Sequence, residues 1–153
     1  MNNRITSLKE KFRVALTSTA KVISEDLTLK NDKLENSNTL EIDDIKSPND
    51  FIRMRADTDS KALKKKFSND LIHKKNLPSS STSRLLYNIA EKIRYESLGG
   101  QMLKGIEKNF NKNYSLMINL KKKDQLKTKE DVPVAEAFEL YMLKNFHQIK
   151  LNP

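Results

Sequence analysis

The side chains that most often carry out catalysis or bind metals are scarce in this sequence of 153 residues. There is no cysteine, which excludes disulfides, thiolate zinc sites and cysteine nucleophiles. The two histidines, His73 and His147, lie far apart, so a metal site would need mostly carboxylate ligands. The strings GxxxxGK(S/T), HExxH, GxSxG and GxGxxG are all missing. The sequence therefore predicts no catalytic residue, and no cofactor or metal bound by this chain alone.

Three short strings bring acids or hydroxyls together. Residues 57–60 (DTDS) lie within a predicted helix and lysines follow them, so we interpret them as helix surface. The serine and threonine run at 79–83 has no histidine nearby to activate a hydroxyl, and it is typical of a linker that caps the next helix. Asp43, Asp44 and Asp50 lack the glycine and the regular spacing of a calcium loop. We therefore assign chemistry to none of these strings.

Arg94 and Glu96 are the charged residues that most invite a functional interpretation. Side chains two positions apart on a helix do not face each other, so we expect each to contact a different neighbour. A buried or interfacial arginine can hold a carboxylate with two hydrogen bonds, which fixes orientation as well as adding energy. The alternative is an exposed charged pair worth under about 1 kcal/mol. Both interpretations are open from the sequence.

These two residues lie in the longest apolar stripe of the chain, from Ser81 to Phe110, which also contains all three glycines. The apolar residues recur at spacings of three and four, which places them on one face of a helix: Leu86, Ile89, Ile93, Leu103, Ile106 and Phe110. Glycine in a helix interior costs roughly 0.5 to 1 kcal/mol relative to alanine. Gly99, Gly100 and Gly105 therefore mark a break into two helices at the Gly-Gly pair, a close approach of another backbone, or positions where glycine is tolerated. A close approach predicts that Gly105→Leu destabilises the fold by about a few kcal/mol through overpacking.

Other segments show the patterns of helices, strands or loops. A capping box at Ser7 and Glu10 predicts a helix that continues to Ile23. The alternation of Leu27, Leu29, Leu40 and Ile42 predicts either two short strands or a coil. Ser47-Pro48 predicts the start of a helix that runs to about residue 73, with apolar residues on one face: Phe51, Ala56, Leu63, Phe67 and Leu71.

The remaining segments are a linker, a loop and a final helix. Residues 73–83 form a linker rich in proline and serine, and the stripe ends at the asparagine-rich NFNKN, after which we expect a loop with dense lysines. Pro133 opens a last helix whose buried face contains Val134, Ala137, Phe138, Tyr141, Met142 and Phe146. The predicted fold class is mainly α: one domain over residues 1–153, with four to five helices and either a small two-stranded β hairpin or a coil.

The net charge of +9 would suit an acidic partner or a nucleic acid. Lysine greatly exceeds arginine, however, and asparagine is frequent, which composition drift in an A- and T-rich gene would produce. Lysines gather at Lys61 to Lys75 and Lys121 to Lys129, and each group is either a solvated face or a binding surface. There is neither a membrane-spanning run nor the apolar segment of a signal peptide, so we expect a cytoplasmic protein.

The string Arg94-x-Glu96-x-x-Gly99-x5-Gly105-Ile106-x-x-Asn109-Phe110 resembles the N-terminal region of the CobT subunit of the aerobic, ATP-dependent cobaltochelatase of cobalamin biosynthesis. The resemblance covers about residues 10–147. Residues 12–24 and 133–146 are similar to the first and last helices of that region. Arg55, Asp59, Ala62-Leu63 and His73 fall between the helices in the family's order.

The resemblance implies an assembly role. Family members are longer, with an acidic middle and a C-terminal von Willebrand A-type domain with an Asp-x-Ser-x-Ser motif, and we expect this chain to cover only the first region. The family subunit pairs with an AAA+ ATPase subunit and a large subunit that inserts cobalt into a corrin precursor, so ATP, Mg and cobalt would be handled by the complex. The alternatives are a basic nucleic-acid-binding module and a truncated remnant without activity. A homo-oligomer of this chain is a further possible assembly.

The positions that match the family are expected to have structural or interface roles, and none of them is assigned to catalysis. They are Arg55, Asp59, His73, Arg94, Glu96, Gly99, Gly105 and Asn109.

Overall fold

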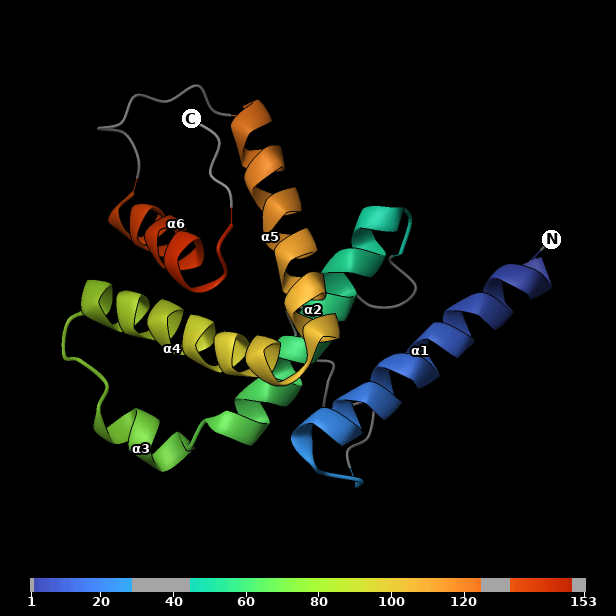
Figure 1. Ribbon diagram of the computed structural model, residues 1–153, viewed down its shortest axis with the longest axis horizontal. Helices are drawn as coiled ribbons and strands as arrows, with labels where there is room; N and C mark the ends of the chain where they lie inside the picture. The colour runs from blue at the N-terminus through green and yellow to red at the C-terminus, as the bar shows by residue number, and fades with distance from the viewer. Residues whose placement is uncertain (1, 29–44, 125–132, 150–153) are drawn as a thin grey trace. The chain divides into compact units, whose positions relative to one another are not determined.

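The computed structural model describes residues 2–28, 45–124 and 133–149, and in these residues it contains six helices and no strand (Figure 1). The predicted mainly α fold class is therefore confirmed. The hairpin expected around Leu29, Leu40 and Ile42 lies outside the described residues. The chain forms two compact units, residues 1–66 and 67–153.

The first unit contains α1 (Asn2–Ser24) and most of α2 (Pro48–Phe67). Its core includes Leu16, Ile45 and Met54, with Phe12 packed against them. The rings of Phe12 and Phe51 meet edge to face, with 4.9 Å between their centroids. This apolar contact explains why the stripe of α1 and the first turns of α2 carry large side chains.

Two expectations for α1 and α2 need correction. The α1 helix starts at Asn2, so Ser7 is inside it, and Glu10 pairs with Arg13 at 2.7 Å instead of closing a capping box. The start of α2 at Ser47-Pro48 is confirmed: Asp50 Oδ2 accepts hydrogen bonds from the backbone N–H groups of Lys46 and Ser47, which hold the pKa of Asp50 below its usual value. However, α2 ends at Phe67, not near residue 73.

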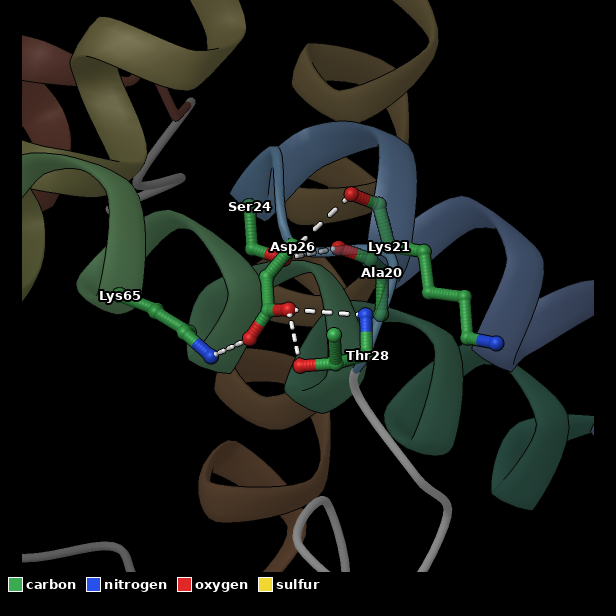
Figure 2. A network of polar contacts seen from close by, with 6 residues as sticks. All are labelled: Ala20, Lys21, Ser24, Asp26, Thr28 and Lys65. Carbon is green, nitrogen blue, oxygen red and sulfur yellow. Dashed lines mark hydrogen bonds and ion pairs between the residues drawn. The ribbon is translucent and has the colours of Figure 1, made fainter.

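The end of α1 turns through Glu25, which has a positive φ of 56°. The Glu25 N–H donates to the Val22 carbonyl and the Asp26 N–H donates to the Lys21 carbonyl at 3.1 Å, the hydrogen bonds of a Schellman motif. Figure 2 shows how Asp26 fixes this turn: its carboxylate accepts the Thr28 N–H and hydroxyl and binds the Lys65 ammonium of α2. The Lys65 hydrogen bond, followed by those from Thr28, lowers the pKa of Asp26.

The second unit contains α3 (Asp70–Lys75), α4 (Ser81–Met102), α5 (Lys104–Asp124) and α6 (Val134–Phe146). The α4 helix contacts both α5 and α6, and Figure 1 shows α6 lying alongside it. Ser80 caps α4, since its hydroxyl accepts the Ser83 N–H at 3.1 Å. The α4 helix is thus the element on which the second unit is built.

Several boundaries in the second unit differ from the expectations. Part of the predicted linker is the short helix α3, capped by the side chain of Asn69. The NFNKN string does not end a helix, because α5 continues through it to Asp124 where a loop was expected. Pro133 does precede the last helix, but Val134, Tyr141 and Phe146 are exposed and Leu143 is buried, so the predicted buried face of α6 is partly wrong. Leu71 and Phe51 are also exposed.

The predicted long helix breaks at Leu103, three residues beyond the Gly-Gly pair. The Leu103 N–H donates to the Gly99 carbonyl at 3.0 Å, and the Leu103 carbonyl accepts the Ile106 N–H at 2.9 Å, so this residue ends α4 and starts α5. A Cβ on Gly100 would lie 3.4 Å from Glu107 Cβ of α5, whereas a Cβ on Gly105 would meet nothing within 4 Å. The overpacking predicted for Gly105→Leu is therefore wrong, and the close approach is at Gly100.

Candidate interaction site

The Arg94 guanidinium is fixed by three hydrogen bonds of 2.7 Å. Nε and Nη2 donate to the two carboxylate oxygens of Glu91, and Nη2 also donates to the Phe67 carbonyl. Ser68 Oγ donates to the same Glu91 carboxylate at 2.7 Å. The hydrogen bond from Arg94 is the main cause that lowers the pKa of Glu91, and the same bond raises the pKa of Arg94. This group of residues joins α4 to the start of the second unit.

Glu96 lies on a different side of α4 and is almost completely buried. Its Oε2 accepts the hydroxyl of Tyr114 from α5, and it lies 3.9 Å from Nε2 of His147, which follows α6. Lys92 Nζ lies 4.0 Å from Glu96 Oε1 and 5.7 Å from the centre of the Tyr114 ring. The expectation that Arg94 and Glu96 contact different neighbours is thus confirmed.

His147 is buried beside two aromatic rings. Its ring centroid is 5.5 Å from that of Tyr114 and 5.9 Å from that of Phe110. Burial lowers the pKa of His147 to about 4, an effect that Lys92 increases and Glu107 opposes. Burial, with the neighbouring Glu96 carboxylate, raises the pKa of Tyr114. Near neutral pH both aromatic groups are therefore uncharged, and this cluster of α4, α5 and the chain after α6 joins three elements by buried polar contacts.

An open groove of about 430 Å³ is lined by α4 and α6 where the two helices lie together. Six of the residues that line it are Tyr87, Ala90, Arg94 and Leu98 of α4 and Met142 and Phe146 of α6. Most of this lining is apolar, and the Arg94 guanidinium is its charged group together with the Glu91 carboxylate bound to it. A groove of this size and composition suits binding of an apolar group or helix better than acid-base chemistry.

A smaller hollow of about 140 Å³ continues the groove, because both are lined by Ser97, Gln101 and Phe146. The lining of this hollow is more polar and includes Lys104 and Glu107 at the start of α5. The two hollows together form a furrow along α4 that is mostly apolar, with the Glu91–Arg94 pair in the larger hollow and the Lys104–Glu107 pair in the smaller one. We call this furrow the α4–α6 groove.

No group of three histidine, aspartate or glutamate side chains in residues 2–28, 45–124 and 133–149 is arranged to hold a metal ion. Within the same ranges, no helix combines the length and apolar character required to cross a membrane.

The comparison with protein families found a match over most of the chain. The model of the cobalamin biosynthesis protein CobT matches residues 6–146, which includes the helices that form the α4–α6 groove. The chain belongs to the CobT family. It therefore has a role in cobalamin biosynthesis. Neither the search of curated proteins nor the search of solved structures found a match.

Two of the CobT-like positions lie in the first unit. Arg55 Nε donates to Asp59 Oδ2 at 3.2 Å, one turn apart on α2, and the Asp59 side chain is fully buried. Thr58 and Ser60 are buried as well, and the Thr58 hydroxyl donates to the Met54 carbonyl at 2.9 Å. The interpretation of residues 57–60 as helix surface is therefore wrong for three of the four. Periodicity missed this because small polar side chains that bond within their own helix can enter a core.

The other CobT-like positions are in the second unit and do not form one site. His73 is in the last turn of α3, with its ring 5.1 Å from that of Tyr87. Gly99 is buried in α4, Gly105 is exposed in α5, and Asn109 is half-buried on α5. Of all the CobT-like positions, Arg94 alone lines the α4–α6 groove. A structural or interface role for the CobT-like positions therefore stays a prediction.

Tyr114 and His147 were not predicted from the sequence as partners of Glu96. Tyr114 follows Phe110 by four positions, a helical spacing that would have extended the apolar stripe beyond NFNKN. His147 carries no such signal, because it lies just after α6 and is buried by the turn at Gln148, where φ is 52°.

Proposed function

We propose that this chain is a non-catalytic N-terminal part of a cobaltochelatase subunit, and that it assembles with an AAA+ ATPase subunit for ATP-dependent insertion of cobalt into a corrin precursor. In this proposal the chain holds the complex together, while ATP, Mg and cobalt are handled by the other parts. Cobalt is then a substrate of the complex and not a resident metal of this chain.

The observation that carries the proposal is the match to the CobT family over residues 6–146. The α4–α6 groove supports an assembly role within that family, because it offers apolar surface that a partner could cover. Phe146, at the end of α6, has 53% of its surface exposed although it is aromatic. Exposed apolar surface bordered by charged groups is typical of protein interaction sites.

The contacts of α2 make nucleic-acid binding a weaker proposal. Lys65 and Lys66, from the cluster that would contact phosphates, are bound to Asp26 and Glu25 of the same unit. Ammonium groups already paired with carboxylates contribute less to binding a phosphate backbone. We therefore prefer a protein partner to a nucleic acid.

The proposal is tested by mixing the full chain with the AAA+ subunit of the chelatase, with and without ATP. Size-exclusion chromatography with light scattering gives the mass of the eluted species. We expect a complex of defined stoichiometry that contains both proteins. Separate elution of both folded proteins in every nucleotide state would reject the assembly role, and steep, salt-dependent binding to duplex DNA would favour the nucleic-acid alternative instead.

A further inference from the structure

We propose that the α4–α6 groove binds one amphipathic helix of the ATPase subunit, with the apolar face of that helix in the groove and its acidic side chains bound to Arg94 and Lys104. This inference rests on the proposed function and specifies the docking surface and the chemistry of the partner.

The length of the groove matches a short helix. Its lining on α4 extends from Tyr87 to Gln101, which at 1.5 Å per residue is roughly 21 Å, or about four helical turns. The lining positions recur every three or four residues, so they form one continuous stripe on α4. A stripe on one helix beside a second helix is the arrangement into which an amphipathic helix inserts apolar side chains at similar spacings.

The lining of the groove provides room and adaptable apolar contact. Ala90 is the smallest side chain in the wall formed by α4, and it leaves space for a larger apolar group. Met142 and Phe146 line the opposite wall, one helical turn apart on α6. Methionine can adjust its rotamer to an incoming side chain, and an exposed phenylalanine gains from being covered. Both walls therefore favour an apolar helix face.

Two cations of the furrow, Arg94 and Lys104, are each paired with a carboxylate of the lining and still offer donors to acidic groups of the partner. The bonds of Arg94 to Glu91 and Phe67 use Nε and Nη2 and orient the guanidinium. Nη1 makes no hydrogen bond to any residue that the structure describes, so it can donate to a partner.

Lys104 is also paired, at 3.1 Å from Glu107, but its side chain is 82% exposed, against 46% for Lys65 and 16% for Lys66. Its ammonium therefore keeps donors that a further carboxylate can reach. Both cations suit carboxylates on the edge of the incoming helix.

The charge of the whole chain favours an acidic partner over a second copy. At a net charge of +9, two copies repel each other, whereas an acidic partner is attracted from a distance. A homo-oligomer formed through this groove is therefore disfavoured, and it becomes one of the outcomes that the experiment distinguishes.

The test compares two charge reversals of equal size in the full chain. Lys104→Glu changes a cation of the furrow, and Lys112→Glu changes an exposed lysine of α5 that does not line it. Affinity for the ATPase subunit is measured by calorimetry at two salt concentrations. We expect Lys104→Glu to weaken binding by roughly tenfold and to reduce its salt dependence, and Lys112→Glu to change it by less than about twofold.

A third variant tests the apolar part of the groove. Ala90→Arg fills the space between the walls and is expected to abolish binding, with far-UV circular dichroism as the check on folding. Because the chain lacks cysteine, a dye can also be placed at Gln101→Cys in the groove and at Ser115→Cys on α5 as a control. Addition of the ATPase subunit should shift the emission of the first dye and leave that of the second unchanged.

Each other outcome overturns the inference in its own way. A complex that forms equally with Lys104→Glu, Lys112→Glu and Ala90→Arg would place the contact elsewhere and leave the proposed function standing. No complex with the unaltered chain would reject both proposals. Self-association that Ala90→Arg removes would make the occupant a second copy of this chain.

Discussion

In the first unit the buried carboxylate of Asp59 is bound by Arg55, four residues earlier on the same helix. In the second unit the buried carboxylate of Glu96 is bound by Tyr114 from another helix and lies near His147 from beyond a third. The Arg55–Asp59 contact needs only one helix to bring its two groups together, whereas the contacts of Glu96 require three elements to pack correctly. The comparison indicates that the contacts of Glu96 join different elements of the second unit, whereas the Arg55–Asp59 contact of the first unit lies within a single helix.

The largest expected effect comes from removal of the cross-helix carboxylate. Glu96→Ala leaves the buried Tyr114 hydroxyl without its acceptor and creates a cavity, so the free energy of unfolding should fall by about 4 kcal/mol. Urea unfolding followed by circular dichroism measures it. Glu10→Ala, which removes an exposed pair within α1, is the control and should cost under about 0.5 kcal/mol. Equal losses in the two variants would show that the buried contacts of Glu96 contribute no more than an exposed ion pair within one helix.

The second effect depends on pH and on His147. Below pH 6.5 the unfolded chain binds a proton at this histidine, but the folded chain does not until pH falls to about 4. The free energy of unfolding therefore decreases as pH falls from 6.5 to about 4, by up to about 3 kcal/mol. The groups that face the ring are Glu96 and Lys92 of α4 and Glu107 of α5.

The measurement is the free energy of unfolding at pH 7, 6, 5 and 4 for the unaltered chain and for His147→Gln. Because carboxylates distant from the ring titrate equally in both chains, the difference between the two curves reports His147 together with the Glu96 carboxylate 3.9 Å from it. We expect the difference to change steadily from pH 6.5 to 4, and parallel curves would show that the imidazole is not buried in the neutral form.

A smaller effect distinguishes the glycines. Gly105→Ala should stabilise the chain by about 0.5 to 1 kcal/mol, because a Cβ there meets nothing and alanine favours the helix. Gly100→Leu should destabilise it, since the side chain would extend from a position where Cβ is already 3.4 Å from Glu107. Thermal melts of both variants test this, and destabilisation by Gly105→Ala would restore the close-approach interpretation at Gly105.

The smallest effect concerns the left-handed residues that end α1 and α6. Gln148→Gly should stabilise the chain by about 1 kcal/mol because glycine adopts positive φ without strain. Glu25→Gly should gain less, since it also loses the ion pair with Lys66. Thermal melts give the size of the two gains; equal gains would mean that the Lys66 pair contributes nothing, and a larger gain for Glu25→Gly would mean that the pair is unfavourable.

The features that the sequence predicted correctly depend on local spacing. The Ser47-Pro48 start, the Pro133 opening of α6 and the separate neighbours of Arg94 and Glu96 all follow from groups within a few residues of each other. The helical class was predictable for the same reason.

The features that were missed depend on contacts distant in sequence. Continuation of α5 beyond Phe110 is favoured by the buried Tyr114 and Ile118, whose packing is invisible to a search for asparagine stops. The α4–α6 groove arises where two helices far apart in the chain lie together, so its lining could not be listed in advance. Burial of His147 depends on a turn after α6 that no residue type signals.

Hydrogen exchange of the full chain, with and without the ATPase subunit, tests most directly whether the second unit is the docking element. We predict slower exchange in peptides from residues 87–101 and 142–146 on addition of the subunit, with no change in residues 48–60 of α2. Slower exchange confined to α2, or no change in any peptide at saturating subunit, would contradict the account.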